Sequence, residues 1–125
     1  MQLSFTSLPD PYAIVRLPAD AAVPEWPSGT GLTSITRAED ELSIVCRADL
    51  IPATVAAERG WSALRVETLA DLDEPGVVMA AVTPISSAGL GVFVISTHLR
   101  DYLLVRSASL TQTRRLLEQA GHVVA

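Results

Sequence analysis

The sequence is poor in the residues that most catalytic sites require. It has no lysine, a single cysteine and only two histidines. Without lysine, neither a Schiff-base mechanism nor a phosphate-binding loop of the Gly-Lys type is available. The lone Cys46 can form no internal disulfide. At the end of an expected strand, we interpret Cys46 as a small buried apolar side chain rather than a reactive thiol.

Long hydrophobic runs are also missing. Hydrophobic residues make up 49% of the 125 positions, yet they never gather into the roughly 18 consecutive apolar residues that a membrane span needs. The stretch before Tyr12 lacks the basic segment and apolar run of a secretory signal. We therefore expect no membrane contact and a cytoplasmic location. The length suits one compact domain or two small lobes.

Charged residues are few, and the basic ones do not cluster. Charged residues are 18% of the chain and the net charge is −5. The arginines are scattered, and only Arg114 and Arg115 are adjacent, so no basic stripe marks a nucleic-acid surface. The low charge and the high apolar content predict that one face meets a partner or a second copy of the chain.

Motifs for catalysis and metal binding are absent. His98 and His122 lie far apart in the sequence and away from the cysteine, so they do not have metal-ligand spacing. No serine lies on a Gly-x-Ser-x-Gly turn. We expect no catalytic residues, no metal and no cofactor, and therefore no enzyme. An acid–base pair formed by His98 and Asp101 is the weakest alternative that we consider.

Apolar periodicity predicts short strands and three helices. The strands are expected at Leu3–Thr6, Tyr12–Leu17, Leu32–Arg37, Leu42–Arg47, Trp61–Glu67, Gly91–Thr97, Tyr102–Arg106 and His122–Val124. The helices are expected at Pro52–Arg59, at Gly76–Gly89 with a kink or break at Pro84, and from a capping box at Ser109 to Gly121. Residues 18–31 are rich in proline and glycine and should form an ordered loop or a single helical turn instead of a regular helix.

Five matched pairs of positions indicate an internal repeat. Each pair is separated by the same 61 positions (97 − 36 = 61), namely Thr36 and Thr97, Asp40 and Asp101, Leu42 and Leu103, Ile44 and Val105, Gly60 and Gly121. The repeat predicts an α+β chain of two ferredoxin-like β-α-β-β-α-β lobes side by side. The lobes are expected to be residues 1–60 and 61–125, and the first has a degraded leading helix.

Two segments of the second lobe have groups suited to a small ligand. A helix that begins near Gly76, Val77 and Val78 offers free backbone N–H groups to an anion such as a carboxylate. The hairpin turn at residues 97–101 ends in Asp101, which suits an ammonium group. Because we expect the loop and the turn at opposite ends of one sheet, such a site needs two lobes or two chains. A plain helix start and a turn aspartate that caps its own backbone are the alternatives.

Three stretches carry a resemblance to a known family. "SITRAEDELSIVC", "GWSALRVE" and "ISTHLRDYLLV" resemble the small tandem type of ACT-domain proteins, related to the aspartokinase regulatory region and to the cytosolic arginine sensor of animals. The resemblance covers about residues 12–122. It implies a regulatory protein that binds a small amino acid at a lobe or subunit interface, forms a homodimer and acts on a regulated enzyme. A ligand-independent dimerisation module with the same fold is the alternative.

The resemblance also implies which residues line the ligand site. Backbone contacts are expected from Gly76, Val77 and Val78, and side-chain contacts from Ser96, Thr97, His98 and Asp101. Family members often have tyrosine where this chain has His98, and a hydroxyl residue where it has Arg100. Both differences are expected to alter recognition of the ligand's side chain. The three acids of the first hairpin turn, Glu39–Glu41, are not expected to bind a ligand.

Overall fold

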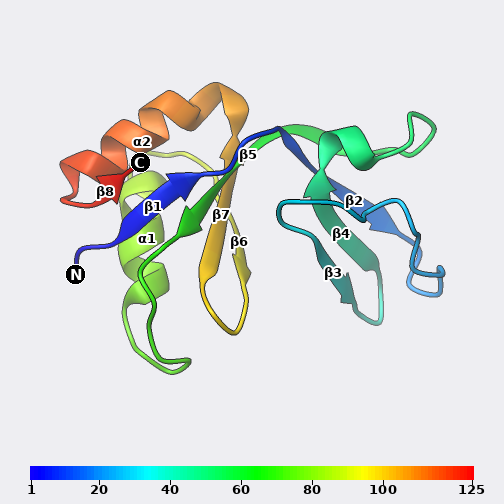
Figure 1. The fold of residues 1–125 in the computed structure, drawn as a ribbon, viewed down its shortest axis with the longest axis horizontal. Helices are drawn as coiled ribbons and strands as arrows, with labels where there is room; N and C mark the ends of the chain where they lie inside the picture. Colours follow the sequence, from blue (N-terminus) through cyan, green and yellow to red (C-terminus); the bar gives the residue numbers. More distant parts are fainter. The chain divides into compact units, whose positions relative to one another are not determined.

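The computed structural model describes residues 1–125 and divides into two compact lobes (Figure 1). The first lobe is Asp10–Trp61, and the second lobe is Met1–Pro9 together with Ser62–Ala125. From the sequence we expected residues 1–60 to form the first lobe. In the structure residues 1–9 belong to the second, because the strand that they form pairs there. No helix is long and apolar enough to cross a membrane.

The second lobe has the predicted β-α-β-β-α-β order. Its elements are β5 (Glu58–Val66, of which residues 62–66 belong to this lobe), α1 (Val77–Ser86), β6 (Phe93–Ser96), β7 (Asp101–Arg106), α2 (Leu110–Gln119) and β8 (Val123–Val124). The strand order is β6-β7-β5-β1-β8, so β1 (Ser4–Ser7) is inserted between β5 and β8. It runs antiparallel to β5 and parallel to β8. The α+β class and the ferredoxin-like fold are confirmed.

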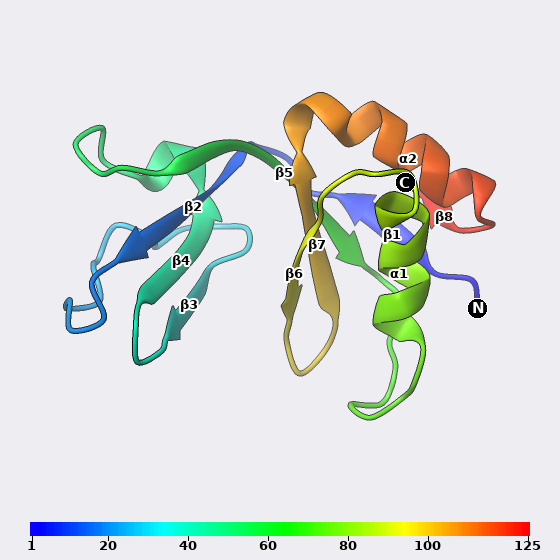
Figure 2. The ribbon, with the colours of Figure 1, turned by 180° about the vertical axis from the view of Figure 1, so that it is seen from behind.

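One face of this sheet and the two helices form the core of the second lobe (Figure 2). Alternate residues of the strands point to that face, including Leu64 and Val66 of β5. Helical spacing brings Ala81 and Ile85 of α1 against them, with Leu117 of α2, and all of these side chains are at most 1% exposed. The α1 and α2 helices also contact each other. The apolar periodicity of β5 and α1 therefore predicts the face that each of them buries in this core.

A buried histidine compensates for the proline in α1. Pro84 has no N–H, so it cannot donate to the carbonyl of Ala80 one turn earlier. The imidazole Nε2 of His122 lies 3.1 Å from that carbonyl oxygen. The N–H of Leu3 donates to Nδ1 of the same ring over 2.9 Å, so the ring proton lies on Nε2. His122 thus connects the start of β1, α1 and the turn before β8, and α1 remains one helix.

The first lobe keeps the strands of the same fold but not its helices. β2 (Tyr12–Leu17), β3 (Ser34–Arg37), β4 (Leu42–Arg47) and the first residues of β5 form a sheet in the order β3-β4-β2-β5. Residues 18–33, which contain the predicted loop, stand where a leading helix would be. The core of the first lobe is a separate apolar cluster of strand residues, and Trp26 and other loop side chains cover it.

The predicted helix at Pro52–Arg59 is wrong. The structure has only a three-residue 3₁₀ turn, η1 (Ala48–Leu50), followed by a turn in which the Val55 N–H donates to the Pro52 carbonyl over 3.0 Å. The segment is short, and β5 already begins at Glu58, where Glu58 is the register partner of Ile14 in β2. Pairing of β5 therefore overrides the weak local helix preference.

The register of the internal repeat also needs correction. In both hairpins a turn bond closes the loop, from the Ala38 N–H to the Glu41 carbonyl (2.8 Å) and from the Thr97 N–H to the Arg100 carbonyl (2.9 Å). These pairs differ by 59 positions (97 − 38 = 59), as do the strands β3 and β6, β4 and β7. The offset of 61 across the hairpins was wrong, because five matches without a gap are too few to fix a register.

The predicted capping box at Ser109 is wrong as well. Ser109 makes no side-chain capping hydrogen bond. It is instead the last residue of a 3₁₀ turn, η2 (Ser107–Ser109), which leads directly into α2. The corresponding turn η1 lies 59 positions earlier, so the backbone leaves the third strand of both lobes in the same way.

Thr113 offers a first test of the second-lobe core. Its side chain is 0% exposed and its hydroxyl has no hydrogen-bond partner. Thr113→Val removes an unsatisfied polar group and keeps the shape, so we expect the free energy of unfolding to rise by about 1 kcal/mol in urea denaturation. The matched control is Thr83→Val on the exposed face of α1, with an expected change within about 0.5 kcal/mol. A clear loss of stability in Thr113→Val would contradict the statement that the Thr113 hydroxyl has no hydrogen-bond partner.

A double-mutant cycle tests the link between His122 and Pro84. His122→Phe keeps a ring in the core but leaves the Leu3 N–H and the Ala80 carbonyl unpaired. We therefore expect it to lower the free energy of unfolding by about 2 kcal/mol. In a Pro84→Ala background the new N–H of residue 84 can bond the Ala80 carbonyl. In that background, the loss of unfolding free energy caused by His122→Phe should be about 1 kcal/mol smaller than in the natural chain. Additive effects in urea denaturation would show that the two residues are not coupled.

Candidate functional site

The structure brings all seven predicted ligand residues around one hollow in the second lobe. This hollow has a volume of about 310 Å³ and is lined by parts of the 68–79 segment and by the turn 96–101. We call it the loop–turn hollow. One wall is the loop that precedes α1 together with the first residues of that helix. The other wall is the turn between β6 and β7.

The direction of the strands explains why these two walls meet. Where β5 enters the second lobe, Ser62 Oγ lies 2.8 Å from Ser107 Oγ, just after β7. At the other end, Glu67 Oε2 lies 3.0 Å from Arg100 Nη1, just before β7. β7 is therefore antiparallel to β5, and it is also antiparallel to β6. β5 and β6 run in the same direction, so the segments that follow them emerge at the same end.

This arrangement corrects the expectation that the loop and the turn lie at opposite ends of the sheet. Both views of the fold show them at one end of the second lobe (Figures 1 and 2). The residues of a single lobe are sufficient to form the hollow. A second lobe or chain is not needed to bring the two walls together.

The start of α1 presents unused backbone donors to the hollow. Gly76 precedes the helix with a φ of 91°, a left-handed conformation that favours glycine. The first helical hydrogen bond runs from the Ala80 N–H to the Gly76 carbonyl over 2.9 Å. The N–H groups of Val77, Val78 and Met79 precede it, and no side chain caps them. Such an end has a partial positive charge and is suited to an anionic group.

The opposite wall is a rigid turn with one partly engaged carboxylate. The Thr97 hydroxyl donates to the Arg100 carbonyl over 2.8 Å and accepts from the Arg100 N–H over 3.2 Å. The Ser96 hydroxyl donates to Oδ1 of Asp101 over 2.5 Å. Oδ2 of Asp101 makes no hydrogen bond within the chain, so the carboxylate keeps acceptor capacity for a ligand.

The single arginine that lines the hollow is already engaged in an ion pair. Arg100 forms an ion pair with Glu67, and Arg65 bonds the other oxygen of the same carboxylate. The hydrogen bond from Arg65 holds the pKa of Glu67 below its ordinary value, with further help from the charges of both arginines. Arg65, Glu67 and Arg100 together keep one net positive charge, which the carboxylates of Asp71, Glu74 and Asp101 outnumber, so the hollow is acidic.

Sequence reasoning located the helix start and the turn but missed other lining residues. His98 lies at the exposed tip of the turn, whereas the second histidine, His122, is in the core. The missed residues include Leu72 and Leu99, two apolar side chains in otherwise polar loops. That contrast was a signal in the sequence, but only the strand directions show that both loops face one hollow.

The equivalent place in the first lobe is occupied by an arginine. Arg37 ends β3 as Ser96 ends β6 (96 − 37 = 59). Its guanidinium donates to the carbonyls of Ala19 and Ala21, the latter over 2.8 Å. These carbonyls belong to the loop after β2, which corresponds to the loop before α1. In the first lobe, therefore, a side chain of the chain itself bridges the two walls.

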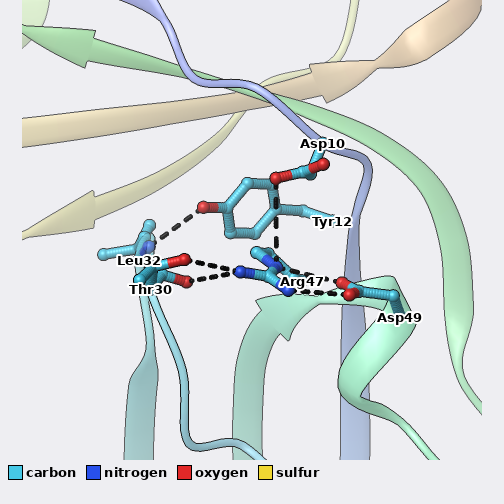
Figure 3. Close-up of polar contacts among 6 residues, drawn as sticks. All are labelled: Asp10, Tyr12, Thr30, Leu32, Arg47 and Asp49. Carbon is cyan, nitrogen blue, oxygen red and sulfur yellow. Dashed lines mark hydrogen bonds and ion pairs between the residues drawn. The ribbon is translucent and has the colours of Figure 1, made fainter.

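A polar network holds the far end of the same loop (Figure 3). Arg47 donates to the Thr30 hydroxyl over 2.6 Å and pairs with Asp49 at 2.7 Å. The Leu32 N–H donates to the buried Tyr12 hydroxyl over 2.9 Å. Between them, Gly31 has a φ of 90°, and an added Cβ would lie 2.5 Å from the Tyr12 oxygen. The bond from Arg47 lowers the pKa of Asp49, so both charges persist at neutral pH.

The structure offers no evident metal centre. No group of three or more histidine, cysteine, aspartate or glutamate side chains is placed to hold a metal ion. The donors and acceptors that line the loop–turn hollow are complementary to a small molecule with an anionic and a cationic end. The uncapped helix start is suited to the first group, and the Asp101 carboxylate to the second.

Comparisons with known proteins agree with this fold. A model of the ACT domain matches residues 56–119, and a second model, described as an N-terminal domain, matches residues 10–54. No curated protein matches the chain.

Solved structures extend the comparison to the whole chain. A structural genomics protein from Agrobacterium tumefaciens is 43% identical, with a TM-score of 0.94, over 100% of this chain and 93% of that one. A Vibrio cholerae protein of unknown function, described as a possible transport protein, is 18% identical over 95% of this chain and 90% of its own, with a TM-score of 0.78. The regulatory subunit of aspartate kinase from Thermus thermophilus, at 11% identity, 89% and 93% coverage and a TM-score of 0.57, shares the fold.

The family follows from these two lines of observation. The ACT-domain match covers a little over half of the chain, and the second lobe has the β-α-β-β-α-β order of a ferredoxin-like fold. The first lobe repeats the strand order of that fold without its helices. The chain belongs to the ACT-domain family.

Proposed function

We propose that this protein is a non-enzymatic regulatory module that binds a small amino acid in the loop–turn hollow. ACT domains are regulatory domains, and the fold is shared with a regulatory subunit of aspartate kinase. The observation that carries the proposal is that the uncapped start of α1, which has a partial positive charge, and the Asp101 carboxylate line one hollow of about 310 Å³. A free amino acid has the complementary pair of charges.

The binding mode follows from the donors and acceptors of the two walls. The ligand carboxylate would accept hydrogen bonds from the uncapped N–H groups of Val77 and Val78, next to Gly76. The ligand ammonium would donate to the free oxygen of Asp101. Ser96 fixes the orientation of that carboxylate.

The other two predicted residues have supporting roles. Thr97 maintains the turn through its two hydrogen bonds to Arg100. His98 lies at the mouth of the hollow and is positioned to contact the ligand's side chain. The proposal thus uses all seven residues that the sequence indicated.

The geometry favours binding over catalysis. His98 is exposed at the tip of the turn, and Asp101 is hydrogen-bonded to Ser96 rather than to His98. General acid–base catalysis requires the two groups to approach one reacting atom in a site that excludes water. An open turn does not provide that environment, so the acid–base alternative has no geometric support.

The second candidate function is a dimerisation or docking module that binds no ligand. One observation favours it: β3 pairs only with β4, and Ile35 on this edge strand is 42% exposed. An exposed strand edge is a common place for a second copy to add. A homodimer formed there is also compatible with the first proposal, in which the ligand would alter association with a regulated enzyme.

Asp101→Asn tests the amino-acid proposal by calorimetry with the full chain. The amide keeps the shape but loses the charge that pairs with the ligand ammonium. We expect binding of the amino acid to weaken about tenfold or more. Because Arg37 occupies the equivalent place in the first lobe, we expect one ligand per chain.

Asp40→Asn on the first hairpin turn is the matched control and should bind like the natural chain. A screen of all twenty amino acids by thermal shift precedes the calorimetry, and ligand at 100 times its Kd should add about 2.7 kcal/mol of stability. A dimer that responds to no amino acid at millimolar concentration would favour the ligand-independent module.

A further inference from the structure

We propose that the amino acid bound in the loop–turn hollow has an uncharged aliphatic side chain. The inference rests on the proposed function and concerns the selectivity of the same site. It is drawn from two features of the hollow: the apolar side chains at its mouth and the distribution of its charges.

Exposed apolar side chains converge on the hollow from all three of its segments. Leu72 of the loop is 73% exposed, Met79 of α1 is 68% exposed, and Leu99 of the turn is 54% exposed. With Val78, they are four of the ten large hydrophobic residues that the whole chain exposes. Single exposed leucines are ordinary, but their convergence on one concave site marks a surface that a ligand covers.

The charges of the hollow oppose an anionic side chain. Asp71, Glu74 and Asp101 all line it, and Arg100 is already paired with Glu67 at 3.0 Å. A ligand such as aspartate would bring a second carboxylate toward these three acids, and the one arginine that lines the hollow is already bound to Glu67. Repulsion between like charges around one small hollow weakens binding, and it selects against such ligands.

A cationic side chain of the ligand contributes less binding free energy than an aliphatic one. Asp71 and Glu74 are both exposed, and ion pairs between solvated groups contribute little because water screens them. An aliphatic side chain instead covers the apolar atoms of Leu72 and Leu99 and is itself removed from water. That gain grows with the buried area. For ligand side chains of equal length, burial of apolar surface therefore contributes more to binding than ion pairs with Asp71 and Glu74.

Calorimetry with two matched pairs of amino acids tests the selectivity. The side chains of L-norleucine and L-lysine have the same number of carbon atoms, and only that of lysine ends in an ammonium group. The side chains of L-leucine and L-aspartate have the same branched shape, but that of leucine ends in two methyl groups and that of aspartate in a charged carboxylate. We expect leucine and norleucine to bind about tenfold more tightly than L-alanine. Lysine should bind more weakly than norleucine, and aspartate should not bind measurably.

Two variants locate the preference in the hollow. Leu72→Ser and Leu99→Ser should each reduce the preference for leucine over alanine, about threefold or more, and leave the affinity for alanine unchanged. The matched control, Val23→Ser, removes a side chain that is 51% exposed in the first lobe. It should change neither affinity.

The outcomes separate this inference from the function on which it rests. If alanine binds but leucine and norleucine bind no more tightly, the selectivity is wrong and amino-acid binding stands. Tighter binding of lysine than norleucine, or measurable binding of aspartate, also overturns the selectivity alone. If none of the amino acids binds, both proposals fall.

Discussion

The position of β7 between β5 and β6 is the constraint on which the candidate site depends. Because β7 runs antiparallel to both neighbours, β5 and β6 must point the same way, and the segments that follow them emerge together. The helix start at Val77 and the carboxylate of Asp101 are thereby brought to one hollow, although they lie far apart in the sequence. Ion pairing of Glu67 with Arg100 joins the two strands at that end. The chemistry of the site is therefore a consequence of strand order.

The same lobe accommodates two departures from a simple ferredoxin-like unit. The strand formed by residues 4–7 enters the sheet beside β5, and Pro84 interrupts the hydrogen bonds of α1. His122 compensates for both, because its ring bonds the Leu3 N–H and the Ala80 carbonyl. The helix that presents its start to the hollow is thus held by a residue near the other end of the chain. Local sequence would not reveal this contact, since each partner is unremarkable alone.

Much of the fold was predictable because it depends on local periodicity. The apolar run in residues 42–47 and the helical spacing in residues 77–86 predict a strand and a helix, and the structure contains both. The failures share another cause. The helix expected at Pro52–Arg59 yields to strand pairing, and the capping box at Ser109 yields to a 3₁₀ turn. The residues proposed to bind the ligand could be selected from the sequence because helix starts and turns have local signatures, and they line one hollow in the structure. Leu72 and Leu99 were missed because only the tertiary fold places them at one site.

The two lobes show how one strand order can keep or lose a site. In the first, Arg37 bonds the loop after β2, whereas Ser96 in the second orients Asp101 toward an open hollow. The most direct test of this account is a titration of the ¹⁵N-labelled chain with L-leucine, followed by amide chemical shifts. The account predicts saturable shifts at the start of α1 and in the turn 96–101, with the loop 18–33 unchanged. Shifts confined to the first lobe, or saturable binding that leaves the start of α1 unaffected, would contradict it.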